Sequence, residues 1–463
     1  MLNIKKAENS WRDFQAEYIA RKQKKAFFLK AAKRCAGMLA ILILTGVLGF
    51  FSVNAYLRFT ADKKNDPARS LQQADELTDP DDLGKSGLSK EKLTHIISTT
   101  PFSKTDKNIF FVNTPEESYK ITTSIDIYLQ EYLLSVMEKL KKLDRGKPQQ
   151  IALVVMEADS GKILAMTGFD LDNPDTNPCV QNYPAASIFK IVTAAAAVET
   201  LGYKPQTPLY FNGNKYTLYK RQLKDVKNKY TYKISFASAF AESINPVFGK
   251  IGKNSLGKIQ LETYADAFGF NQIIDSELPL VSGSFEIGDS DYHLAELGCG
   301  FNNDTTISPV FGAMLTAAII NSGNVMVPSI VEHVTGSDGK IIYKNRKSTY
   351  KTAIRPETAD TMMQLMEKTI TKGTARKSFR GASKDTVLST LVIGGKTGSL
   401  YNTEHTIKYD WFTGFAAQKD GNTKITLSIV VGHGKYIGTR AGTYAKMILK
   451  QYFKKNDDIT AQL

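Results

Sequence analysis

A run of 23 residues without a charged side chain lies between Arg34 and Arg58. A helix of that length, at ~1.5 Å per residue, covers the ~30 Å hydrocarbon core of a bilayer. Residues 1–34 carry ten Lys and Arg side chains against three acidic ones, and the positive-inside rule keeps such a flank in the cytoplasm. The sequence therefore predicts a basic cytoplasmic segment at 1–34, one transmembrane anchor at 35–57 in the cytoplasmic membrane, and an extracytoplasmic remainder.

A cleaved signal peptide is the alternative interpretation of this run, because Val53, Asn54 and Ala55 form an acceptable cleavage site. The uncharged run is, however, longer than the ~7–15-residue apolar core of a signal peptide. We therefore prefer the membrane anchor.

The composition of the remainder excludes several classes of protein. Residues 35–463 carry half of the chain's net charge of +14, which we interpret as scattered solvated lysines, with attraction to anionic lipid or polymer as the alternative. The chain has no nucleic-acid-binding motif, and its five histidines lack metal-binding spacing, so no nucleic acid, metal or cofactor is expected. Cys179 and Cys299 either form one disulfide or remain buried thiols.

Two regions follow the membrane segment. Four prolines and mixed charges interrupt residues 58–120, which predicts a stalk or a small membrane-proximal module. The main domain is expected at 121–463. Its first helix is predicted from apolar residues spaced by fours and threes after Asp126, namely Leu129, Leu133, Val136, Leu140 and Leu143.

Strand signals occur at both ends of this main domain. Two apolar runs flank the turn residues Asp159, Ser160 and Gly161, which predicts a hairpin. Residues 391–399 are typical of a strand, 411–434 of a second hairpin turning at 420–422, and 442–455 of a closing helix. Because the sequence between is mostly helical, we predict an α/β domain of the α+β type. Its single antiparallel sheet is built from both ends and flanked by helices, with a helical subdomain as second lobe and a cleft between the lobes.

Ser187 and Lys190 lie three residues apart at the start of an apolar, alanine-rich stretch. On a helix such side chains are neighbours, at ~5–6 Å between Cβ atoms, so the amine can reach the hydroxyl. A lysine takes the proton of a serine only when neutral, so desolvation or a second cation must lower its reference pKa of ~10.4. The alternative is that Ser187 is a helix N-cap and Lys190 a surface residue.

Two further segments offer the other groups of such a site. Lys396 supplies a second cation, and Ser243 and Asn245 lie on a short polar turn before Pro246. The alternatives are a charge that protects an edge strand for Lys396 and a plain turn for the serine and asparagine. Three glycines near Lys396 are expected to let a ligand backbone approach that strand: Gly394, Gly395 and Gly398.

In this order, Ser187-Ile-Phe-Lys190, Ser243-Ile-Asn245 and Lys396-Thr397-Gly398 resemble the three motifs of penicillin-binding proteins and serine β-lactamases. Surrounding segments are similar to those of high-molecular-weight, class B-like penicillin-binding proteins, and the similarity covers roughly residues 119–452: "ITTSIDIYLQEYL", "ALVVMEADSGKILAM", "KGTAR" and "DWFTGFAA". The resemblance implies a β-lactamase/transpeptidase-like fold.

The resemblance also implies a function. It points to a membrane-anchored D,D-transpeptidase that cross-links peptidoglycan stem peptides through a serine acyl-enzyme and is inhibited covalently by β-lactams. Its partners would be D-Ala-D-Ala stem peptides, β-lactams, the cytoplasmic membrane and proteins of a wall-synthesis complex. Two alternatives stay open: a D,D-carboxypeptidase or β-lactamase that uses water as acceptor, and a β-lactam sensor or non-catalytic scaffold.

The implied roles fall on specific residues. Ser187 would attack the D-Ala-D-Ala bond with Lys190 as base, and Ser243 would pass a proton to the leaving D-alanine. Asn245 would hold the substrate amide and orient Lys190. The third motif completes the implied site, with Lys396 and Thr397 binding the terminal carboxylate next to Gly398, and the backbone N–H groups of Ser187 and Ser399 forming the oxyanion hole.

The sequence departs from the family pattern in three places. Ala185 and Ala186 precede the serine where a proline-glycine pair is common, and Ser399 stands where threonine is commoner. The short segment 58–120 leaves little room for the pedestal of elongation and division transpeptidases. The specific role in wall growth is therefore left open.

Overall fold

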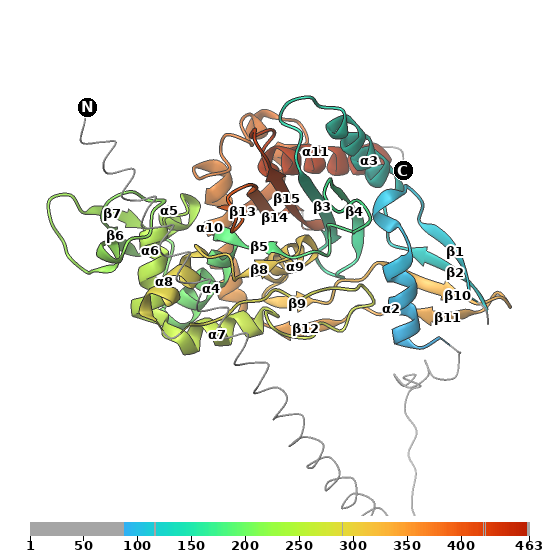
Figure 1. The fold of residues 1–463 in the computed structure, drawn as a ribbon, viewed down its shortest axis with the longest axis horizontal. Helices are drawn as coiled ribbons and strands as arrows, with labels where there is room; N and C mark the ends of the chain where they lie inside the picture. The colour runs from blue at the N-terminus through green and yellow to red at the C-terminus, as the bar shows by residue number, and fades with distance from the viewer. Residues whose placement is uncertain (1–87, 115–116, 289, 420, 422, 461–463) are drawn as a thin grey trace, which may run out of the picture. The chain divides into compact units, whose positions relative to one another are not determined.

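The computed structural model describes residues 88–114, 117–288, 290–419, 421 and 423–460 (Figure 1). The chain divides into two compact units, 1–78 and 79–463, and all described residues belong to the second. The predicted cytoplasmic segment and membrane anchor lie outside the described residues. Within the described part of the chain, no helix combines the length and the apolar character needed to cross a bilayer.

The centre of the domain is a five-stranded antiparallel sheet with the strand order β13-β14-β15-β3-β4. Its N-terminal strands form the predicted hairpin around residues 159–161, and its C-terminal strands come from the other end of the domain. The sheet built from both ends is therefore confirmed. The strands are β3 (Gln150–Glu157), β4 (Ile163–Asp170), β13 (Leu391–Tyr401), β14 (Lys408–Gln418) and β15 (Lys424–His433).

Helices cover both faces of this sheet. Successive strand residues point to opposite faces, and in β3 the odd-numbered residues 151–155 pack with α3 and α11 while the even-numbered residues 152–156 pack with α9. Every residue of α9 is buried, which makes it the central helix of the domain. These helices are α3 (Ile127–Lys141), α9 (Pro309–Ile320) and α11 (Ala441–Thr460), and α10 (Pro356–Thr371) packs along β13.

Helix α3 shows how the apolar spacing determines the local fold. Asp126 caps its first turn by accepting a hydrogen bond from the backbone N–H of Leu129 at 3.0 Å. Four of the five predicted apolar positions are buried, but Leu143 is 39% exposed because the helix ends at Lys141. The prediction for Leu143 was therefore wrong.

Residues 190–299 form the predicted helical subdomain, with a small hairpin at its outer edge (Figure 1). Glycine allows its short helices to pack closely; a Cβ on Gly252, for example, would lie 2.8 Å from the Cα of Gly298. The elements are α4 (Lys190–Leu201), β6 (Pro208–Phe211), β7 (Tyr232–Ser235), α5 (Phe236–Ala241), α6 (Asn245–Lys250), α7 (Gly257–Ala267) and α8 (Asp291–Cys299).

A second sheet was not predicted. Residues 331–344 were assigned to the mostly helical region, but they form two strands that pair with each other, and the first of them also pairs with β2. Strand β2 runs through the predicted boundary at residue 120. Helix α2 belongs to this same N-terminal part. The elements are α2 (Lys90–Thr99), β1 (Ile109–Asn113), β2 (Ser118–Thr123), β10 (Val331–Thr335) and β11 (Ile341–Lys344). Two short pairs complete the strands: β5 (Tyr183–Pro184) with β8 (Thr306–Ile307), and β9 (Asn324–Met326) with β12 (Thr349–Thr352).

Candidate active site

Ser187 lies in a single 3₁₀ turn, Ala186–Phe189, directly before α4. In a 3₁₀ helix the side chains at i and i+3 eclipse each other, so the Lys190 amine reaches the hydroxyl, with Nζ 2.7 Å from Oγ. The alternative interpretation of this pair is wrong. Phe189, not Ser187, is the N-cap of α4, and Lys190 is completely buried.

Three neutral oxygens surround the Lys190 amine. Nζ donates to Ser187 Oγ at 2.7 Å, to Asn245 Oδ1 at 2.8 Å and to the backbone carbonyl of Cys299 at 2.5 Å. An ammonium has three N–H donors, whereas a neutral amine has two and one lone pair. Because the amide oxygen and the carbonyl can only accept, they retain the two N–H groups of the neutral amine, and its lone pair is left for the proton of Ser187.

Burial lowers the pKa of both lysines of the site, because it disfavours their charged forms. Desolvation lowers the pKa of Lys190 to about 8, and Cys299 opposes this shift. Desolvation also lowers the pKa of Lys396 well below its usual value, and the positive charge of Lys190 lowers it further. The neutral amine that a general base requires is thus accessible near neutral pH.

Ser243 and Asn245 lie on the link between α5 and α6. Ser243 has a φ of +58° and follows the end of α5, where a left-handed residue closes the helix, and Pro246 fixes the first turn of α6. Asn245 is buried, and its Nδ2 donates to the carbonyl of Tyr216 at 3.0 Å, which orients Oδ1 toward Lys190. These contacts exclude the interpretation of this segment as a plain surface turn.

Lys396 lies on β13, opposite Thr413 of β14. Its side chain is fully buried, so it is not a solvated charge that protects an edge strand. Nζ donates to Ser243 Oγ at 2.9 Å and to the carbonyl of Thr397 at 2.8 Å. The three distant motifs therefore meet through two amines, Lys190 on Asn245 and Lys396 on Ser243.

The residues that follow Lys396 in the third motif, Thr397 and Gly398, lie on the same strand, as does Ser399. The hydroxyl of Thr397 lies 2.5 Å from that of Thr374, and Ser399 is exposed on the outer end of β13. Gly398 lies against the nucleophile turn, because a Cβ there would come within 3.2 Å of the Ala185 carbonyl and of Ala186 Cβ. Any larger residue at 398 would push the strand and the turn apart.

The explanation given for two of the glycines was wrong. A Cβ at Gly394 would lie 2.3 Å from the ring of Phe415, and one at Gly395 would lie 2.5 Å from the ring of Phe412. Both aromatic rings belong to the core of the domain. Gly394 and Gly395 therefore make room for the protein's own side chains and not for a ligand backbone.

Gly300 packs directly against the 3₁₀ turn that carries Ser187. Ala186 has a φ of +49°, and a Cβ on Gly300 would approach the Ala186 carbonyl oxygen to 1.9 Å. Gly202 provides a matched control, since it also ends a helix at a φ of +64° but has no atom within 4 Å of the Cβ position. The two glycines thus differ in their surroundings and not in their backbone conformation.

We expect Gly202→Ala to lower the free energy of unfolding by about 1 kcal/mol, the left-handed cost alone, with normal acylation by penicillin. Gly300→Ala adds an overpacking cost of about 1–3 kcal/mol and, by displacing Ser187, slows acylation roughly 100-fold. Denaturant titration and labelling with a fluorescent penicillin measure the two effects. Equal effects in both variants would contradict the role assigned to Gly300.

Cys179 and Cys299 are both buried free thiols, so the structure contains no bond between them. Burial raises the pKa of Cys179 to about 12 and that of Cys299 to about 11. Cys299 contributes to the site through its backbone carbonyl, which Lys190 contacts.

Space for a ligand is found next to the second motif. A cavity of about 480 Å³ is lined by residues that flank Ser243 on the chain, Glu242 and Ile244, and by Lys215 and Tyr216. Lys215 and Glu242 form an ion pair of 3.1 Å at its edge.

The fold and the lysine-bound serine define a class: an α+β domain built for serine acyl transfer. The sequence profile of the penicillin-binding protein transpeptidase domain matches residues 151–454. The chain therefore belongs to the penicillin-binding protein transpeptidase family.

Curated relatives agree with this assignment. The peptidoglycan D,D-transpeptidase PbpA of Mycolicibacterium smegmatis is 24% identical over 368 residues, which are 70% of this chain and 70% of that protein. The stage V sporulation protein D of Bacillus subtilis is 24% identical over 307 residues, 62% of this chain and 45% of that protein. The chain thus spans less than half of the second relative.

Solved structures show the same fold. The D,D-transpeptidase domain of a peptidoglycan glycosyltransferase from Eggerthella lenta has a TM-score of 0.58 at 22% identity, covering 73% of this chain and 83% of that one. The ceftriaxone acyl-enzyme complex of penicillin-binding protein A from Mycobacterium tuberculosis has a TM-score of 0.57 at 22% identity, covering 72% and 79%.

Sequence reasoning missed three contributors to the site: the carbonyls of Cys299 and Tyr216 and the hydroxyl of Thr374. The two carbonyls leave no signal in a sequence, because every residue has one. Thr374 lies in "KGTAR", a segment singled out for its resemblance alone, and that resemblance was the signal that pointed to it.

Proposed function

We propose that the chain is a peptidoglycan D,D-transpeptidase that works through an acyl-enzyme on Ser187. One observation carries this proposal: the fully buried amine of Lys190 lies 2.7 Å from the Ser187 hydroxyl and is held by two oxygens that can only accept. Membership of the transpeptidase family and relatives named as D,D-transpeptidases support it. Acyl-enzyme complexes of a protein with the same fold also support it.

In the acylation half-reaction, neutral Lys190 accepts the Ser187 proton while Oγ bonds to the carbonyl carbon of the penultimate D-alanine. The C–N bond to the terminal D-alanine then breaks, and the proton that Lys190 took from Ser187 passes through the Ser243 hydroxyl to the leaving amine, so that Lys190 and Ser243 both end neutral. The backbone N–H groups of Ser187 and Ser399 are the proposed donors to the oxyanion. The amine of a second stem peptide then attacks the ester, loses a proton to the site and releases Ser187 as a hydroxyl.

Lys396 is proposed to bind the terminal carboxylate of the substrate together with Thr397. In the free site its charge is disfavoured by burial and by Lys190. An incoming carboxylate favours the charged form, so substrate binding is accompanied by proton uptake. Lys396 also holds the Ser243 hydroxyl at 2.9 Å, which links carboxylate binding to the proton relay.

The choice of acceptor is tested with the full chain in detergent and stem peptides ending in D-Ala-D-Ala. Mass spectrometry follows two products, the cross-linked dimer and the hydrolysed peptide. We expect the dimer to exceed the hydrolysed peptide. Hydrolysis alone would replace the proposal with a D,D-carboxypeptidase, and a stable penicillin adduct without any turnover of peptide would replace it with a sensor or scaffold.

We further propose that residues 35–57 anchor the chain in the cytoplasmic membrane, with the catalytic domain outside. The uncharged run and its basic flank support this proposal. The chain should remain in the membrane fraction after alkaline carbonate extraction, and protease added outside the membrane should cleave the domain. Release by carbonate would contradict the anchor.

A further inference from the structure

The segment that leads from β6 into β7 carries a concentration of positive charge. Residues 214–233, here called the basic arm, contain seven basic residues and one acidic residue. The arm alone therefore has a charge of +6, the same as each of two other basic segments of the domain, residues 340–355 and 368–384. What distinguishes the arm from the other two is the group of exposed tyrosines and the cavity that accompany its charge.

Most of these charges are unpaired and face solvent. Among the described residues, only Lys215 of the seven forms an ion pair with an acidic side chain. The other six are exposed: Lys220, Arg221, Lys224, Lys227, Lys229 and Lys233. A cluster of one sign without counter-charges attracts an anionic partner.

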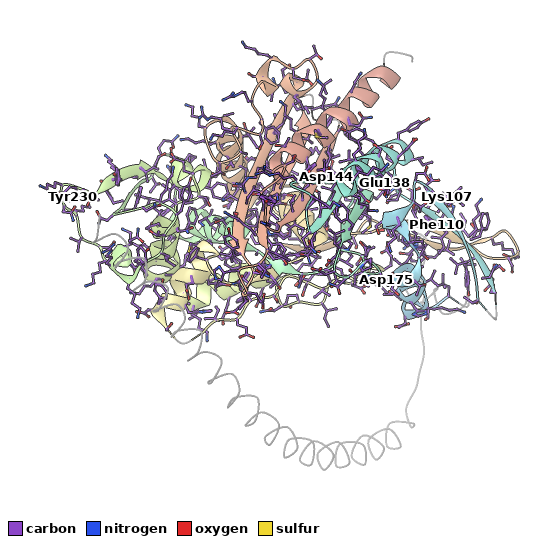
Figure 2. All side chains as sticks on the ribbon, turned by 45° about the horizontal axis from the view of Figure 1, so that its top comes forward. Lys107, Phe110, Glu138, Asp144, Asp175 and Tyr230 are labelled. Atoms are coloured by element: carbon purple, nitrogen blue, oxygen red, sulfur yellow. The ribbon has the colours of Figure 1, made fainter. Side chains whose placement is uncertain are left out.

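The arm also presents tyrosines. Tyr216, Tyr219, Tyr230 and Tyr232 are 41–69% exposed, and Tyr230 lies at the outer end of the domain (Figure 2). Basic groups of the arm lie over several of these rings, as Lys229 does over Tyr230 at 5.0 Å and Arg221 over Tyr219 at 5.4 Å. Tyrosine combines an apolar ring with a hydroxyl that can form hydrogen bonds.

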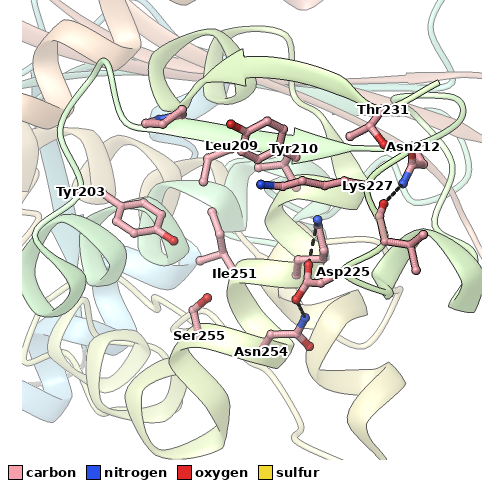
Figure 3. A pocket seen from close by; sticks show the side chains of 14 residues that line it. Tyr203, Leu209, Tyr210, Asn212, Asp225, Lys227, Thr231, Ile251, Asn254 and Ser255 are labelled. Carbon is pink, nitrogen blue, oxygen red and sulfur yellow. Dashed lines mark hydrogen bonds and ion pairs between the residues drawn. The ribbon is translucent and has the colours of Figure 1, made fainter. Parts of the chain in front are cut away.

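A cavity of about 220 Å³ lies at the base of the arm (Figure 3). Lys227 crosses it with Nζ 4.1 Å from the centre of the Tyr210 ring. Asp225, the single acid of the arm, is neutralised by Lys250 at 3.1 Å and contacted by the amide of Asn254 at 3.4 Å. The cavity therefore combines an aromatic ring, amides and a free ammonium, and it is smaller than the ~300–1,000 Å³ of typical ligand pockets.

We propose that the basic arm and this cavity bind an acidic polysaccharide, a chain of sugar units that carry carboxylate or phosphate groups. The cavity takes one sugar unit, with its ring next to Tyr210 and its hydroxyls on the amides, and the anionic groups of the neighbouring units meet the exposed lysines. A cavity of this size fits one unit of a repeating chain better than a complete ligand.

The composition of the arm favours a polysaccharide over a membrane surface or a nucleic acid. Membrane-surface segments insert large apolar side chains, but Val226 is the only exposed aliphatic residue of the arm. Single-stranded nucleic acids stack bases on open aromatic faces, whereas basic groups lie over the rings of Tyr219 and Tyr230 in the arm. Hydroxyl and amide groups together with unpaired cations match a hydroxylated polyanion.

The arm is joined directly to the candidate active site. Its first residues hold Asn245, because the Asn245 backbone N–H donates to the Lys215 carbonyl at 2.8 Å and Nδ2 donates to the Tyr216 carbonyl at 3.0 Å. A polymer on the arm is thereby kept close to the site. This consequence rests on the proposed function, whereas the binding itself does not.

The test uses the full chain in detergent micelles and measures binding of polygalacturonate, with its methyl ester as the uncharged analogue. The arm variant is Lys224→Gln, Lys227→Gln and Lys229→Gln combined. The control variant, Lys344→Gln, Lys347→Gln and Lys351→Gln, removes three exposed lysines from another basic segment, residues 340–355. Polyphosphate and vesicles containing phosphatidylglycerol are the competing probes.

We expect wild-type protein to bind polygalacturonate and not its ester. Each lysine near an anionic polymer contributes roughly fivefold to the affinity. The arm variant should therefore bind polygalacturonate about 100-fold more weakly than the wild type, and the affinity of the control variant should stay within about twofold of the wild-type value. Equal weakening in both variants, or no binding by the wild type, overturns the proposal. The proposal is also overturned if the wild type binds polyphosphate or the vesicles as tightly as it binds polygalacturonate. Acylation by penicillin should be normal in both variants, so loss of acylation would concern the proposed function instead.

Discussion

Replacing Ser187 by alanine is expected to abolish covalent capture of penicillin while the fold stays intact. The reason is that Ser187 Oγ is the atom that enters the new bond, and no neighbouring group occupies the same position next to the Lys190 amine. The hydroxyl accepts one hydrogen bond from Lys190, so its removal should lower the free energy of unfolding by only about 1 kcal/mol. Intact-mass analysis after incubation with penicillin G measures the adduct, and thermal unfolding measures the fold.

Ser243→Ala is the control for this experiment, because it removes the other serine hydroxyl that contacts a buried lysine. Ser187 remains in that variant, so an adduct should still form, at a rate reduced by the loss of the proton relay. Peptide mapping should place the adduct on residue 187. An adduct on Ser187→Ala protein, or one mapped to residue 243, would show that the nucleophile has been assigned to the wrong residue.

Lys190→Met is expected to slow acylation by about 1,000-fold, within the range that loss of a general base produces. Methionine has a similar length and no charge, so it fills the buried site without a proton acceptor. Lys190→Arg should be impaired to a similar degree, because a guanidinium keeps its positive charge and cannot accept the proton. The rate of labelling by a fluorescent penicillin gives these values, with thermal unfolding as the check on folding.

The arginine variant distinguishes two roles for Lys190. If the amine acts only as a positive charge that stabilises the oxyanion, Lys190→Arg would retain most of the activity and Lys190→Met would not. If it acts as the base, both variants lose activity. Substantial labelling of folded Lys190→Arg protein would therefore exclude Lys190 as the general base.

The main sheet could be predicted because its signals are local. The turn at 159–161 and the apolar runs on each side are sufficient to identify a hairpin, and the same holds for the hairpin around 420–422. The pairing of β10 with β2 could not be predicted in this way. It joins residues about 210 positions apart, and no local pattern specifies which strand edge a distant strand will meet.

The site was predictable in its residue types and not in its geometry. The three triplets and their order identified the groups that converge, Lys190 on Ser187 and Lys396 on Ser243. The left-handed backbone of Ala186, its contact with Gly300 and the carbonyl of Cys299 depend on tertiary packing. Gly394 and Gly395 show the opposite error, since a core packing requirement was mistaken for ligand access.

The most direct test of the neutral lysine is the pH dependence of wild-type acylation by penicillin G. Burial lowers the pKa of Lys190 to about 8, and only the neutral amine accepts the Ser187 proton, so the rate must rise with pH. We expect a rise of about tenfold per pH unit below pH 8 and a plateau above about pH 9. A rate that stays constant between pH 6 and pH 9, in protein that remains folded throughout, would contradict the assignment of Lys190 as the base.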